Sequence, residues 1–203
     1  MLIPSVPILP NKRLIHGHTP VPAGYLTNLL VNSSYDDSST SAIPLLAPLK
    51  LFGITYNSFY VGSNAYLTFN GASNAYSSLS PGNPGIAIHF GSGDRSFQRV
   101  SYENIPARQA VRVLYEGTGD TGGTVGQSTV RICFTFFPNN IIQADFGQAV
   151  TWPNGNWAIS DGQRWRLNYS NSIQLNNSSI TFFATDANGQ NWDMRPGMIV
   201  DAL

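Results

Sequence analysis

Residues 130–146 read VRICFTFFPNNIIQADF, and this stretch decides the fold class of the chain. Its first half alternates between two sets of side chains, as a strand does when its faces differ. The residues expected on one face are Val130, Ile132, Phe134 and Phe136. A Pro-Asn-Asn turn at residues 138–140 precedes a partner strand at residues 142–146. The pattern predicts an antiparallel hairpin with one face in a hydrophobic core.

The same two-residue period recurs on both sides of this hairpin. Strands are predicted at residues 56–61, 65–69, 86–90, 111–116, 164–169 and 180–184. A Gly-Ser-Asn turn at residues 62–64 joins the first two strands into a hairpin. Short alternating strands separated by turn signals predict an all-β protein, built as an antiparallel β-sandwich. No helix of more than two turns is predicted, while residues 25–31 fit a strand and a helix equally well.

Composition agrees with an all-β fold. Of the 203 residues 12% are aromatic and only 11% are charged, and the formal net charge is zero. Aromatic side chains favour strands, and the many Asn, Gly and Ser residues favour turns. Lys12, Lys50, Glu103 and Glu116 are the only lysines and glutamates, so strong helix formers are scarce. Without a basic excess, we expect no nucleic-acid partner.

Residues 1–24 form a separate region, predicted to be an extended proline-rich arm. They contain five prolines and no amphipathic period, whereas residues 25–203 fit a single sandwich domain. The apolar side chains expected to dock the arm are Leu2, Ile3, Val6, Ile8 and Leu9. Burying each contributes about 1.5–3 kcal/mol, which ordering costs of about 1–2 kcal/mol per residue nearly offset. The arm therefore needs neighbouring subunits, or alternatively folds back across the edge of its own domain.

Signals for export and for membrane insertion are missing from the sequence. The first residues do not combine a charged region with an apolar one, so no signal peptide is predicted. No apolar run approaches the roughly 20 residues that cross a membrane, so no membrane insertion is expected. We expect a protein made in a cytoplasm. A surface-type composition without an export signal is best explained by a particle that is released by lysis.

Patterns that would indicate catalysis or a bound metal are weak. His16 and His18 would need a third ligand such as His89 to hold a metal ion. The glycine-rich residues 116–123 precede a strand, whereas a phosphate loop precedes a helix. No predicted strand end gathers two carboxylates as a glycosidase requires. We therefore expect no catalytic residue, no metal and no cofactor.

The single cysteine carries structural information only. Cys133 excludes an intramolecular disulfide, because there is no second cysteine. It shares one face of its predicted strand with Arg131 and Thr135. The alternation therefore places it away from the main core.

In a rigid sandwich, function is expected in loops and on exposed faces. The aromatic residues assigned to loops, and thus candidates for surface recognition, are Tyr76, Trp152, Trp157 and Trp192. Aromatic groups beside small polar residues suit adaptable recognition of sugar or protein. The alternative is that the tryptophans pack in the core or on hairpins. Asp94, Arg95 and Arg99 are candidates for ion pairs, either within the fold or across a subunit boundary.

Several motifs resemble those of known families. Residues 60–69, YVGSNAYLTF, resemble a hairpin of nidogen-like extracellular β domains, with Ala65 in place of the usual small turn residue. More closely, about half of the chain resembles a domain of virion structural and tail-fibre proteins from phages that infect cyanobacteria. The pieces that carry this resemblance are YSSLSPGNP at 76–84, DRSFQRV at 94–100, RVLYEGT at 112–118 and RICFTFF at 131–137.

The resemblance implies a virion component without a defined catalytic residue. The expected protein is a tail, tail-fibre or baseplate component, not an enzyme, that assembles with other virion proteins. Copies of the chain are expected to form a homo-oligomer, with a trimer favoured in a fibre. One alternative is a module that binds host-surface polysaccharide through its aromatic loops, and a weaker one is a capsid decoration protein. Position on the particle, copy number and any glycan stay open.

Overall fold

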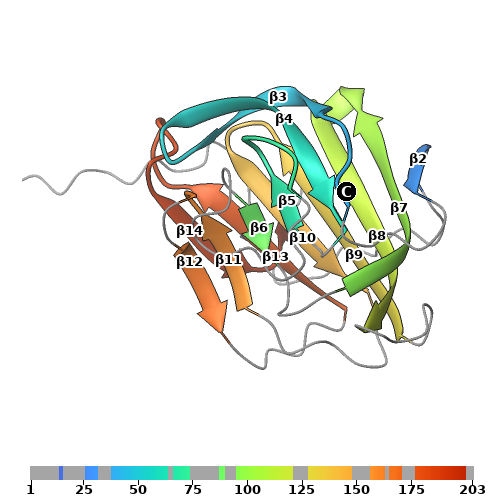
Figure 1. Ribbon diagram of the computed structural model, residues 1–203. Coiled ribbons are helices and arrows are strands. Elements are labelled where there is room, and N and C mark those ends of the chain that lie inside the picture. Colours follow the sequence, from blue (N-terminus) through green and yellow to red (C-terminus); the bar gives the residue numbers. More distant parts are fainter. Residues whose placement is uncertain are drawn as a thin grey trace, which may run out of the picture.

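The computed structural model describes residues 14–15, 26–31, 38–63, 66–73, 87–89, 95–120, 128–147, 156–162, 165–170 and 177–199. Within these ranges the chain is almost entirely β, and the helical element there is one turn of 3₁₀ helix at Pro106–Arg108. Two large antiparallel sheets lie on one another as layers (Figure 1). The predicted all-β sandwich is confirmed.

One layer is a seven-stranded sheet with the strand order β14-β13-β10-β9-β8-β7-β2. Its strands are β2 (Asn28–Val31), β7 (Arg95–Ile105), β8 (Ala110–Asp120), β9 (Ser128–Phe137), β10 (Ile141–Phe146), β13 (Ser178–Ala184) and β14 (Trp192–Pro196). Neighbouring strands pair antiparallel throughout. Strands β7 to β10 follow one another along the chain and in the sheet, so sequence neighbours build its centre.

The other layer is a six-stranded sheet with the order β12-β11-β6-β5-β4-β3. Its strands are β3 (Ile43–Leu51), β4 (Ile54–Gly62), β5 (Tyr66–Thr68), β6 (Ala87–His89), β11 (Asn156–Ser160) and β12 (Trp165–Ser170). A short third sheet pairs β1 (Leu14–Ile15) with β15 (Met198–Ile199). This third sheet joins a part of the arm to the end of the described chain.

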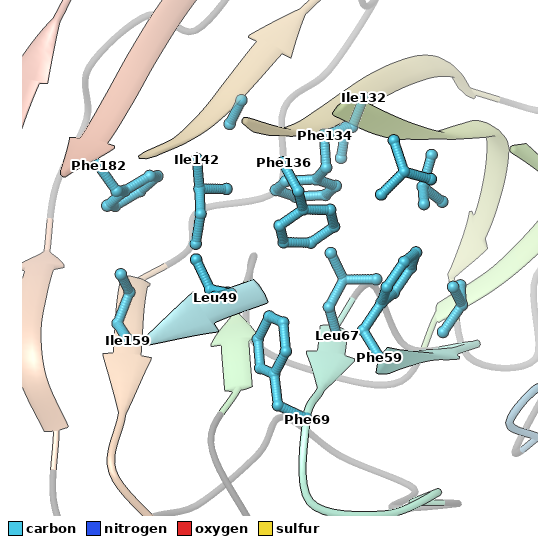
Figure 2. Close-up of a cluster of buried hydrophobic side chains, with 14 of the residues drawn as sticks. Leu49, Phe59, Leu67, Phe69, Ile132, Phe134, Phe136, Ile142, Ile159 and Phe182 are labelled. Atoms are coloured by element: carbon cyan, nitrogen blue, oxygen red, sulfur yellow. The ribbon is translucent and has the colours of Figure 1, made fainter. Parts of the chain in front are cut away.

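The main core lies between the two large sheets. Figure 2 shows Phe134, Phe136, Ile142 and Phe182 pointing from one sheet toward Leu49, Phe59, Leu67 and Phe69 of the other. The Phe136 ring lies 4.9 Å from the Phe59 ring and meets the Phe69 ring edge-on at 5.7 Å. Edge-on and tilted aromatic pairs add about 0.5–1.5 kcal/mol beyond burial of their area. Aromatic interdigitation therefore holds the layers together.

The two predicted hairpins are confirmed. Strands β9 and β10 pair with Phe136 opposite Ile142, and the turn between them places Asn139 and Asn140 at positive φ, which asparagine tolerates. Strands β4 and β5 pair with Val61 opposite Leu67. The strand pairing of both hairpins agrees with the prediction, and in the β9–β10 hairpin the turn residues agree as well.

Other elements differ from the sequence prediction. Strands β3 and β7 were not predicted, and β14 and β15 extend the series beyond residue 184. In β7, Phe97 and Val100 both reach the main core although three positions separate them, so the two-residue period is broken. In β3, Pro44 and Pro48 have no backbone N–H group to donate to a neighbouring strand. Such prolines are typical of an edge strand, but they made this strand hard to predict from the sequence. Residues 28–31, which fitted helix or strand, form β2.

The described part of the arm pairs with its own chain. Leu14 stands opposite Ile199 and Ile15 opposite Met198 in the antiparallel β1–β15 pair. The five apolar side chains expected to dock the arm, from Leu2 to Leu9, lie outside the described residues. For β1, contact with the chain's own domain is the observed arrangement.

Candidate functional site

The side of the seven-stranded sheet that faces away from the six-stranded sheet carries polar as well as apolar side chains that are buried. We call it the outer face. Its buried polar side chains are Ser101, Glu116, Thr135, Gln143, Asp145, Ser179 and Thr181. They alternate along their strands with core residues such as Val113 and Phe134, so they project from the opposite side of the sheet. Burying polar groups is costly unless each is hydrogen-bonded, so their partners decide the character of this face.

One row of the outer face is an ion-pair cluster that ties three strands together. Arg99 on β7, Glu116 on β8 and Arg131 on β9 stand opposite one another in the register. Arg99 donates from Nε to Glu116 Oε2 at 2.6 Å and from Nη2 to Oε1 at 2.8 Å. Arg131 Nη1 lies 3.1 Å from the same Oε1. Both oxygens of a carboxylate that is only 8% exposed are thus held by guanidinium groups.

Of the three residues predicted as candidates for ion pairs, Arg99 belongs to this cluster. Arg99 pairs within the fold, and its partner is Glu116. Arg95 stands opposite Asp120 in the β7–β8 register, and Asp94 lies outside the described residues. The sequence reasoning missed Glu116 because strand β7, which brings Arg99 beside it, was not predicted.

A second charged pair lies further along the same two strands. Glu103 on β7 stands opposite Arg112 on β8, and Oε1 of Glu103 accepts from both Nε and Nη2 of Arg112. Thr27 lies beside the pair, with its hydroxyl 3.4 Å from the other carboxylate oxygen. The pair is partly exposed, so its contribution to stability is screened by solvent.

Asp145 is the most enclosed carboxylate that the described outer face contains. It is 3% exposed and lies on β10. Gln143 donates from Nε2 to both of its carboxylate oxygens, at 2.9 and 3.0 Å. Ser179 on β13 donates its hydroxyl at 2.6 Å. These donors replace water around the charge and link β10 to β13.

Cys133 lies on the outer face, in a small apolar cluster with Leu26 and Leu114. Its predicted place off the main core is confirmed. Burial raises the pKa of the Cys133 thiol well above its ordinary value, and the negative charge of Asp145 adds to the effect. Because only the thiolate is a good nucleophile, this thiol is unreactive at neutral pH while it stays covered.

The carboxylates of the described outer face are all held by donor groups. Glu103, Glu116 and Asp145 each accept hydrogen bonds or ion pairs from neighbouring strands. Across the described ranges, no three His, Cys, Asp or Glu side chains gather in a way that could hold a metal ion. The described ranges also contain no helix long and apolar enough to cross a membrane. The polar contacts of the outer face therefore hold neighbouring strands together.

Two of the aromatic recognition candidates do not lie in loops. Trp192 begins β14 and is buried in the main core, so its assignment as a surface residue is wrong. Its indole Nε1 donates to the Gly189 carbonyl oxygen at 3.0 Å, and its ring packs 6.5 Å from that of Phe52. The alternation of Trp192 and Met194 with Asp193 and Arg195 was the signal for a strand.

Trp157 is also part of a strand, because it lies in β11 opposite Tyr169 of β12. Its assignment to a loop is therefore wrong. Tyr76 and Trp152 lie outside the described residues.

Comparisons with protein-family models, with curated proteins and with solved structures find no match to this chain. The class that the fold and the outer face define is an all-β sandwich whose outer sheet face carries buried polar side chains.

Proposed function

We propose that this protein is a structural component of a bacteriophage particle, most simply of the tail, a tail fibre or the baseplate. It works by assembling with other virion proteins and with copies of itself. The observation that carries the proposal is the β1–β15 pair, in which a segment of the arm pairs as a strand with a strand near the end of the described chain, in a small sheet of its own. Strand addition gives affinity through the main chain and is a recurrent way for extended segments to attach.

The position of β1 supports different roles for the two parts of the arm, with one part anchoring the arm and the other binding a neighbour. Leu14 and Ile15 anchor its base beside the C-terminal strand. The apolar residues from Leu2 to Leu9 precede this anchor by a few positions. In the proposed role, the anchor fixes where the apolar segment leaves the sandwich, and a neighbouring subunit receives it. Anchoring one end of a segment lowers the entropy that it loses on binding.

One edge of the six-stranded sheet supports contact through side chains rather than through uncontrolled pairing of backbones. Strand β3 lies at this edge, and Pro44 and Pro48 remove two of its backbone donors. Leu46 on β3 and Ile54 on β4 are the exposed large apolar residues of the described ranges, at 39% and 55%. A low density of charge makes contacts of this kind insensitive to salt.

The proposal is tested by particle assembly with altered arms. We would replace Leu2, Ile3, Val6, Ile8 and Leu9 together by serine, and in a second variant delete residues 1–22. The matched control replaces the polar Ser5 and Asn11 by alanine. We expect both arm variants to fold yet to be recovered in purified particles at less than a tenth of the wild-type level, with the control unchanged. Incorporation of the serine variant at the wild-type level would refute the role of the arm.

A further inference from the structure

Two Asn-Gly dipeptides lie in loops that the structure describes, and their surroundings differ. Asn70 and Gly71 lie just after strand β5, whereas Asn188 and Gly189 lie in the turn between β13 and β14. Both asparagine residues are exposed. Another Asn-Gly pair, at 154–155, falls outside the described residues. In such a dipeptide the chain can attack its own side chain, because glycine has no Cβ atom to hinder the approach of its nitrogen.

The reaction is an intramolecular deamidation, and water is its co-reactant. The backbone nitrogen of the glycine loses its proton to solvent base and attacks Cγ of the preceding asparagine. A C–N bond forms and the side-chain nitrogen leaves as ammonia, so the product is a cyclic succinimide. Water then opens this ring at either carbonyl carbon and gives aspartate or isoaspartate, without oxidation or reduction. The reaction therefore requires a glycine nitrogen that is free to move toward the side chain.

At Asn188 the fold restrains this nitrogen. The Gly189 N–H donates to the Asp186 carbonyl oxygen at 3.2 Å. The Asn188 N–H donates to the Asp186 carboxylate at 2.9 Å. Gly189 also lies so close to strand β3 that a Cβ atom would be 2.3 Å from the Lys50 carbonyl oxygen. Attack on the Asn188 side chain has to break these contacts first, and each lost hydrogen bond raises the barrier.

The described surroundings of Asn70 lack these restraints. Neither the Asn70 side chain nor the Gly71 N–H forms a hydrogen bond with another described residue. A Cβ atom built on Gly71 would have no neighbour within 4 Å, so the space around the dipeptide is open. Gly71 is held through its carbonyl oxygen, which accepts from the Thr68 hydroxyl. Within the described part of the chain, the attacking nitrogen thus has no hydrogen bond to give up.

We propose that Asn70 is a site of spontaneous deamidation, and that the fold protects Asn188 although a glycine follows it as well. Deamidation of Asn70 adds a negative charge to a chain whose formal net charge is zero. The isoaspartate product also adds a carbon atom to the backbone directly after Phe69, which packs in the main core. The inference concerns a chemical modification of a single chain, so it goes beyond the proposed function and stands without it.

Peptide mapping of the native chain during incubation at mildly alkaline pH tests the proposal. The mass change of each peptide and its isoaspartate content give the two deamidation rates separately. We expect Asn70 to react at least about tenfold faster than Asn188, a ratio that corresponds to about 1.36 kcal/mol of barrier. In urea, where the turn contacts are lost, the two rates are expected to converge. Equal rates in the native chain, or an equally large ratio in urea, would overturn the proposal.

A variant of the protecting turn provides a second test. Asp186→Ala removes the carboxylate that accepts from three backbone N–H groups of this turn. It is expected to raise the Asn188 rate several-fold and to leave the Asn70 rate unchanged. The matched control is Asp193→Ala on the following strand, which should alter neither rate. A folded Asp186→Ala chain in which Asn188 reacts as slowly as in the wild type would overturn the protective role of the turn. Neither test depends on particle assembly.

Discussion

The hydroxyl of Tyr115 lies 3.0 Å from the main-chain carbonyl oxygen of Tyr66, although the two residues belong to different sheets. The same hydroxyl is 3.1 Å from the Gly62 carbonyl oxygen, at the other end of the β4–β5 hairpin turn. The Tyr115 side chain is fully buried and packs 4.7 Å from the Phe97 ring. One polar group in the core thus fixes the hairpin turn of one layer over β8 of the other.

Replacing Tyr115 by phenylalanine should destabilise the protein by about 1–3 kcal/mol. The change leaves buried carbonyl oxygens without their donor, and the cost is that of an unsatisfied buried group. Urea denaturation followed by tryptophan fluorescence measures it. The control is Tyr102→Phe on the adjacent strand β7, where the side chain is half-buried and the expected change is below about 0.5 kcal/mol. Equal stability of both variants would contradict a bridging role for the Tyr115 hydroxyl.

Gly189→Ala should also be destabilising, because two constraints act at this residue. Its φ is +64°, and a Cβ atom would lie 2.3 Å from the Lys50 carbonyl oxygen. Left-handed strain costs about 1 kcal/mol, and displacement of the backbone adds to it, so we expect a loss of about 2–4 kcal/mol. Thermal unfolding by circular dichroism measures the loss. The neighbouring exposed Ala187→Ser serves as the control, and a Gly189→Ala variant as stable as this control would disprove the close approach.

The Asp186 side chain should make stability depend on pH in a defined direction. Its carboxylate accepts from the backbone N–H groups of Asn188, Gln190 and Asn191, which lowers the pKa of Asp186 below its usual value. A lowered folded-state pKa stabilises the protein above the unfolded-state value of about 4, and the effect is lost as pH falls through the folded-state pKa.

The test is the urea midpoint of the wild type and of Asp186→Asn from pH 7 to pH 2. The wild type should exceed the variant at pH 7, and the difference should shrink steadily below pH 4. Asp193→Asn is the control, as this carboxylate is about half exposed. A difference that grows toward acid pH would be opposite in sign to the expectation.

The Arg99–Glu116 pair should show measurable coupling in a double-mutant cycle. We expect a coupling free energy of about 1 kcal/mol between Arg99→Gln and Glu116→Gln. The bidentate contact strengthens the pair, whereas the exposure of about one third of the Arg99 side chain weakens it. The coupling should weaken in 1 M salt. The matched control is Arg195–Asp193, a single 3.4 Å contact between exposed side chains, for which coupling near zero is expected. Equal coupling free energies for the two pairs would show that burial of Glu116 does not strengthen its ion pair.

Local alternation was enough to predict the parts of the fold that sequence neighbours build. In β9, Ile132, Phe134 and Phe136 face the core, while Cys133 and Thr135 face the other way, as predicted. The β9–β10 hairpin was predictable as well, since its partners are joined by a short asparagine turn. Both features depend only on the strand period and on the chemistry of a turn.

The candidate site was less predictable, because it depends on pairing between distant segments. Glu116 faces both Arg99 and Arg131 only when β7, β8 and β9 lie side by side. Trp192 was assigned to the surface, and its true place follows from the pairing of β14 with β13. A single sequence contains the residues of such contacts but no signal of which strands meet.

By itself the sequence determined an all-β chain, the direction in which most strand side chains point, and the distinct nature of its first 24 residues. These properties follow from residue type and from the two-residue period, which act locally. Tertiary structure decided that the outer face is buried, that Asp145 is enclosed by Gln143 and Ser179, and that β1 lies against β15. Burial and cross-strand contact are properties of segments far apart in the chain, so they come into being only when the sheets close on one another.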